Sequence, residues 1–118
     1  MNLALARMKA GASLASVLPL IDDRATDSRF DSSVSESHAW ARPARAFFYA
    51  AEIEAARVYC ERVTRIGSGS ESDLVAGMRL PLIKGDLPAA AKSAADRLSR
   101  YDGDTGRRDV AGLAFIAA

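Results

Sequence analysis

The sequence is poor in the residues from which recognisable catalytic and metal sites are built. Its 118 residues include one cysteine, one histidine and one tryptophan. Because Cys60 is alone, no intramolecular disulfide can form, and a reducing compartment is expected. Proline and glycine are also scarce, with four and eight residues, and the apolar fraction is 49%. These values exclude fibrous and low-complexity chains and indicate a folded globular domain.

An excess of charge of one sign is missing as well. Sixteen basic and 15 acidic residues leave a net charge of +1, which gives no reason to expect nucleic acid or an anionic membrane as partner. The apolar run "AGASLASVLPLI", residues 10–21, follows Arg7 and Lys9 as in a signal peptide, but no small-residue cleavage site comes after it. Its 12 residues are too few to span a bilayer. We therefore expect a protein partner and no membrane segment.

The charges are unevenly distributed along the chain. Residues 20–41 contain five acidic side chains and two arginines, and residues 42–65 contain five arginines and three glutamates. Two solvated faces would explain this pattern, and the alternative is a charged docking surface. On that alternative, the partner-binding candidates of the acidic stretch are Asp22, Asp23 and Asp27.

Helical signals begin at the N-terminus and are interrupted by a polar stretch. The segment 1–18 is compatible with a helix that Pro19 ends. Residues 22–36 have the composition of a long polar loop. Within it, the capping-box spacing of Ser33 and Glu36 predicts a short helix that Pro43 interrupts.

The strongest helical signal runs from Pro43 to Ile66, where "GSGS" ends it. Apolar side chains cover roughly 200° of its circumference, more than the stripe of an ordinary surface helix. Its polar stripe is a ladder of alternating charges. A helix of this kind must be covered on more than one side, by its own domain or by a neighbouring subunit.

Three consecutive aromatic residues, Phe47, Phe48 and Tyr49, lie in this segment. Neighbours in a helix are about 100° apart, so the three rings cannot all face one core. We expect Phe47 and Tyr49, together with Trp40, to be partly exposed and to bind a partner protein. The alternative is that another helix of the same chain covers the outward ring.

The C-terminal half is also predicted to be helical. The spacing of Ser70 and Asp73 predicts a short helix over "SDLVAGM". We expect an extended connection over "RLPLIKGD", and then an alanine-rich helix over residues 87–101. The segment 107–118 fits either a helix or a strand. The chain is therefore predicted to be one all-α domain, residues 1–118, of four to five helices with a long polar loop near residues 22–36.

The stretch "DGDTG", residues 102–106, places two carboxylates two positions apart, as in some metal–phosphate sites. A calcium-binding EF-hand loop that began at Asp102 would need Gly at its sixth position and Glu at its twelfth, where this chain has Arg107 and Leu113. The five residues resemble the acidic loop of the nucleotide-binding subunit of dihydroxyacetone kinases. The long helical domain that follows that loop has no counterpart in the 12 residues that remain here. We expect a turn, with no metal or cofactor.

Cys60 and His38 are the only candidates for a nucleophile and its base. Cys60 falls on the apolar side of the predicted central helix, where cysteine usually behaves as a small buried hydrophobe. No further pattern surrounds the two residues. We therefore expect no catalytic site and no enzymatic activity.

Two stretches carry a resemblance, "IEAARVYCERVTRIG" and "DLPAAAKSAADRLSRYDGD". Over residues 48–103 the chain is similar to the helical head–tail connector family of tailed phages and gene-transfer particles. Two features depart from that family: about 20 polar residues precede the central helix, and "RLPLIKGD" has no counterpart. The resemblance implies a non-enzymatic, self-associating ring subunit that joins portal to tail, in the virion or the host cytoplasm.

Two other functions stay open. One is a small inhibitor, encoded by a phage or mobile element, that occludes a host protein through the acidic segment 22–36. The other is a fragment that binds metal or nucleotide through "DGDTG".

Overall fold

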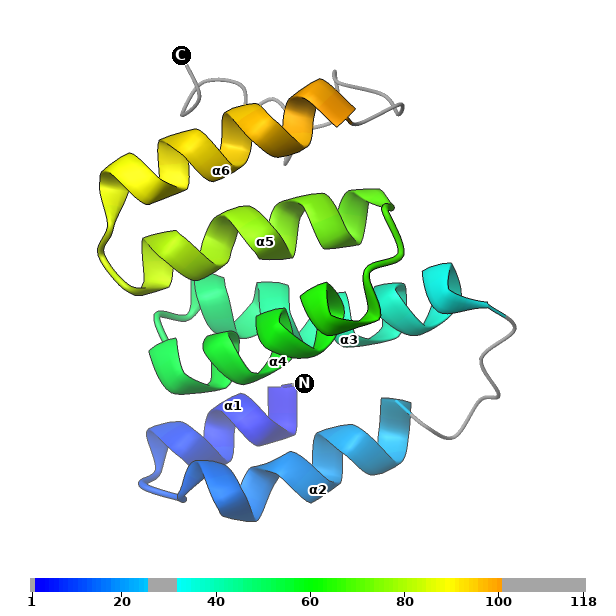
Figure 1. Ribbon diagram of the computed structural model, residues 1–118. Coiled ribbons are helices and arrows are strands. Elements are labelled where there is room, and N and C mark those ends of the chain that lie inside the picture. The colour runs from blue at the N-terminus through cyan, green and yellow to red at the C-terminus, as the bar shows by residue number, and fades with distance from the viewer. Residues whose placement is uncertain (1, 26–31, 101–118) are drawn as a thin grey trace.

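The computed structural model describes residues 2–25 and 32–100 of the chain, which form six α-helices. Their bounds are α1 (Asn2–Lys9), α2 (Leu14–Ala25), α3 (Ser33–Tyr49), α4 (Ile53–Ile66), α5 (Glu71–Ile83) and α6 (Leu87–Arg100). No strand occurs within these two ranges, so the predicted all-α class is confirmed, with more helices than the four to five expected. Figure 1 shows the hairpin of α1 and α2, then the pair α3 and α4, then α5, with α6 outermost.

The core lies between α3, α4 and the α1–α2 hairpin. Tyr59 of α4 is fully buried, and its ring stacks on Phe47 at a centroid distance of 5.9 Å and on Trp40 at 6.0 Å. Val17 and Ile21 bring α2 onto the same cluster. A second, smaller cluster joins α5 to α6 around four buried residues, Leu74, Val75, Met78 and Ala94. The aromatic stack is thus what holds α3 against α4.

The prediction of one central helix from Pro43 to Ile66 is wrong. The chain reverses between Tyr49 and Ile53, so α3 and α4 run antiparallel and bury each other's apolar sides. This mutual packing explains the unusually wide apolar sector of the segment. No glycine or proline marks the reversal, which is why the sequence pattern did not reveal it.

The same type of turn closes three hairpins. Two backbone hydrogen bonds end α3, from Glu52 N to Phe47 O at 3.0 Å and from Ala51 N to Phe48 O at 3.2 Å, which is the pattern of a Schellman motif. The equivalent bonds end α1 and α5. In each turn one residue adopts a left-handed backbone. This residue is Gly11 after α1 (φ 98°) and Gly85 after α5 (φ 76°), whereas after α3 it is Ala51 (φ 59°).

Proline was expected to end helices at three places, and that expectation is wrong. Pro19 lies inside α2, Pro43 inside α3 and Pro81 inside α5. An interior proline removes one backbone hydrogen bond, but packing of the neighbouring side chains outweighs this loss here, and Pro43 is itself buried. The segment "RLPLIKGD" is therefore mostly helical, and the expected extended connection is reduced to the turn around Gly85.

The predicted polar loop is shorter than residues 22–36. Asp22 and Asp23 belong to α2, and α3 begins at Ser33. The capping box lies one residue earlier than expected: Ser32 Oγ accepts from Ser35 N at 3.2 Å, and Ser35 Oγ accepts from Ser32 N at 3.1 Å. The predicted sites at Asp27 and "DGDTG", and the segment 107–118, lie outside the described residues.

The left-handed Ala51 gives a first prediction. Alanine in this conformation is strained by roughly 1 kcal/mol relative to glycine, so Ala51→Gly should raise the free energy of unfolding by up to about 1 kcal/mol in urea denaturation. Ala50→Gly is the matched control. Ala50 has an ordinary φ of −83°, and glycine there should lower stability. Equal effects at the two positions would contradict the assigned turn.

Candidate functional site

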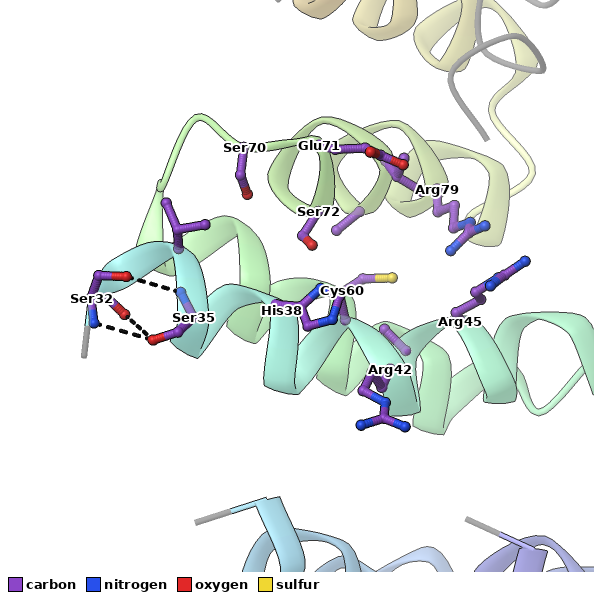
Figure 2. Close-up of a pocket in the computed structure, with 15 residues that line it drawn as sticks. Ser32, Ser35, His38, Arg42, Arg45, Cys60, Ser70, Glu71, Ser72 and Arg79 are labelled. Atoms are coloured by element: carbon purple, nitrogen blue, oxygen red, sulfur yellow. Dashed lines mark hydrogen bonds between the residues drawn. The ribbon is translucent and has the colours of Figure 1, made fainter. Parts of the chain in front are cut away.

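A groove of about 540 Å³ opens between α3 and α5, along the side of α4 (Figure 2). Its floor is made of small side chains, Ala41, Ala44, Cys60 and Ala76, of which the last three are buried. Three packed helices normally fill the space between them with large apolar side chains. Small residues from all three helices leave that space open.

The walls of the groove carry three arginines among mostly neutral side chains. His38, Arg42 and Arg45 come from α3 and Arg79 from α5, while Glu71 at the start of α5 is the one acidic side chain among the described residues of the lining. Figure 2 shows the guanidinium groups of Arg45 and Arg79 reaching toward each other across one end of the groove, whereas Arg42 points away from α5. The groove therefore combines an apolar floor with a positive wall.

Tyr49 lies at the same end of the groove as these two arginines. The guanidinium carbon of Arg79 is 4.8 Å from the centre of the Phe48 ring and 5.3 Å from that of Tyr49, and Arg45 lies 5.6 Å from the Tyr49 ring. Arg79 Nη2 also donates a long hydrogen bond, 3.4 Å, to the Tyr49 hydroxyl. Arg79 is buried, at 6% exposure, and these cation–π contacts hold its guanidinium group in place.

Cys60 is buried at the floor, as predicted. Burial raises the pKa of its thiol to about 11, because the charged thiolate would be poorly solvated there. At neutral pH the thiol is therefore protonated and a poor nucleophile. Among the residues of known placement, no three histidine, cysteine or acidic side chains are grouped to hold a metal ion. The chemistry that the groove offers is apolar contact plus positive charge.

The aromatic candidates of the sequence are separated by the fold. Tyr49 is 59% exposed, as expected. Phe47 and Trp40 are buried, at 0% and 8% exposure, so the expectation that they are partly exposed is wrong. The reversal after Tyr49 places both rings against Tyr59. Of the three, only Tyr49 is exposed.

The acidic candidates are also separated. The Asp22 carboxylate faces inward and accepts hydrogen bonds from the Tyr59 hydroxyl at 2.9 Å and from Arg62 at 2.8 and 3.2 Å. The Arg62 guanidinium in turn lies 4.9 Å from the ring centres of Trp40 and Tyr59. Asp22 thus fastens α2 to α4, whereas Asp23 is exposed.

Sequence reasoning missed the groove and its arginines. Arg42 and Arg45 counted only toward the excess of arginine over residues 42–65, and the helix that carries Arg79 was expected to end before that residue. One signal was present: His38, Arg42 and Arg45 follow at spacings of four and three, which places them on one helical face.

Comparisons with protein-family models, with curated proteins and with solved structures find no match to this chain. None of the helices described is both long enough and apolar enough to cross a membrane. Functional inference therefore depends on the groove and the surfaces around it.

The inward carboxylate gives a second prediction. Asp22→Asn removes the charge that Arg62 and Tyr59 bind, and should lower the free energy of unfolding by roughly 1–3 kcal/mol in chemical denaturation. The exposed neighbour provides the control, because Asp23→Asn makes the same change of charge without removing the contacts to Tyr59 and Arg62, and should lower stability less than Asp22→Asn does. If both variants lost the same stability, the Asp22 contacts would not hold α2.

The buried thiol predicts a loss of stability in alkali. A pKa raised in the folded protein means that the neutral thiol is favoured there, so its contribution is complete below the ordinary pKa of 9.0 and is lost as the pH rises toward about 11. Burial and the hydrogen bond to Asp22 also raise the pKa of Tyr59, which extends the decline to higher pH. The denaturation midpoint of the wild type should therefore fall from pH 8 upward. The midpoint of Cys60→Ala should fall less steeply than that of the wild type between pH 9.0 and 11. Identical slopes would show that Cys60 ionises as freely as in the unfolded chain.

Proposed function

We propose that the protein is a non-enzymatic structural subunit that associates with copies of itself and acts through protein contacts, as its resemblance to head–tail connectors implies. The observation that carries the proposal is the groove between α3 and α5, which joins an apolar floor to a wall containing three arginines. Arginine and tyrosine around an apolar centre are typical of the energetically important part of protein interfaces.

The distribution of charge along the groove favours a protein over a small molecule. The volume of about 540 Å³ is within the range of small-molecule pockets. However, Arg42 points away from α5, so the three arginines of the lining do not all converge on one point. An extended surface with several carboxylates matches this spacing better than a single anionic group does.

The alternative functions receive less support. An inhibitor that docks through its acidic segment would have to do so without Asp22, which is engaged with Tyr59 and Arg62. The nucleotide or metal alternative depends on residues 102–106, which lie outside the described ranges. Neither alternative makes use of the groove.

The proposal predicts self-association that depends on Tyr49. Sedimentation over about a hundredfold range of concentration should show an average mass that increases with concentration. Tyr49→Ala should weaken association by at least about tenfold, since large exposed aromatics commonly anchor interfaces. Leu3→Ala is the control, because Leu3 is equally exposed, at 59%, but lies on α1. A monomer at every concentration would refute the proposed function.

A further inference from the structure

We propose that the groove between α3 and α5 receives the α3–α4 turn of a second copy, with Ile53 on the apolar floor and Glu52 and Glu54 against the arginines. This inference rests on the proposed self-association and names the two surfaces that meet. It is carried by the chemical match between the groove, which α3, α4 and α5 form, and the turn between α3 and α4.

The projecting surface is the tripeptide Glu52–Ile53–Glu54 at the start of α4. Ile53 is 47% exposed, and the Glu54 side chain is 69% exposed although it pairs with Arg57 on the same helix. The apolar side of α4 that faces the core begins two residues later, at Ala55. The structure therefore leaves an exposed branched apolar side chain between two carboxylates.

The receiving surface has the complementary composition. Ala41, Val75 and Ala76 offer apolar surface, while Arg42 and Arg45 place positive charge at its edge. Burying Ile53 on this floor would remove apolar surface from water on both sides. Carboxylates beside the arginines would form charge pairs that set the orientation of the contact and oppose docking of a basic surface.

The turn of one copy cannot occupy its own groove. The groove runs along the side of α3 from Ser32 to Arg45, whereas the turn lies beyond the end of α3, after Tyr49. The stack of Tyr59 on Phe47 and Trp40 fixes α3 and α4 relative to each other. The match can therefore be satisfied only between copies.

A contact between two different surfaces has a consequence for assembly. Each copy that inserts its turn into a neighbour keeps its own groove available for a third copy. Such contacts generate closed rings or open arrays, depending on the rotation between neighbours. This is the type of contact that a ring subunit needs.

The test uses charge reversal and mixing of the full chain, measured by sedimentation. Arg45→Glu reverses the groove, and Glu52→Arg reverses the turn, so each variant alone should lose association by at least about tenfold. An equimolar mixture should regain oligomers, because the reversed turn of one variant matches the reversed groove of the other, and the unaltered turn matches the unaltered groove. Circular dichroism checks that both variants keep the helix content of the wild type.

A second pair of variants separates the apolar contact from the charges. Ile53→Ser should weaken association, whereas Leu87→Ser should leave it unchanged. Leu87 is the matched control because it is the first residue of α6, as Ile53 is of α4, and is 67% exposed.

The outcomes distinguish this inference from the proposed function. If the wild type is a monomer throughout, self-association itself is refuted. If the wild type associates but neither charge reversal weakens it, or the mixture fails to regain oligomers, the copies meet through other surfaces and the turn-in-groove contact is wrong. Equal loss from Ile53→Ser and Leu87→Ser would overturn it as well.

Discussion

The stacking of Tyr59 between α3 and α4 is the interaction on which the other parts of the structure depend. Its ring packs on Phe47 and Trp40, and its hydroxyl reaches the Asp22 carboxylate of α2. Cys60, the next residue, faces the other way and lines the floor of the groove. One turn of α4 therefore joins the N-terminal hairpin to the core on one side and builds the candidate site on the other.

The opposite wall of the groove is held from outside by α6. Gly77 of α5 leaves space for the Arg97 guanidinium, which a Cβ atom at this position would strike. Arg97 lies 3.8 Å from a carboxylate oxygen of Asp73, and Ser93 Oγ donates to Gly77 O at 3.3 Å. These contacts, with the cluster around Leu74 and Ala94, fix the outer face of α5. The inner face of α5 contributes Ala76 and Arg79 to the groove.

Much of the fold could be predicted from local patterns. Periodicity and capping residues identified an all-α chain, the end of α4 before Gly67 and the alanine-rich α6 that begins at Leu87. These features depend on residues close together in sequence, and the patterns that encode them are strong.

The failures came where long-range packing overrides local preference. Ala51 takes a conformation that usually requires glycine, and the prolines of α2, α3 and α5 remain inside helices because the tertiary contacts of those helices stabilise them. The groove was missed for the same reason. It exists only once α3, α4 and α5 pack together, and no single segment of the sequence shows that four side chains of the floor are small.

Intermolecular paramagnetic broadening tests the central claim, that the turn of one copy lies in the groove of another, most directly. A nitroxide label on Ala50→Cys, in a Cys60→Ala background, would be mixed with isotope-labelled copies that carry no nitroxide. The account predicts that amide signals of the isotope-labelled copies broaden around Ala41–Arg45 and Val75–Arg79. Broadening confined to α6 or the α1–α2 hairpin, in samples whose mass shows oligomers, would contradict it.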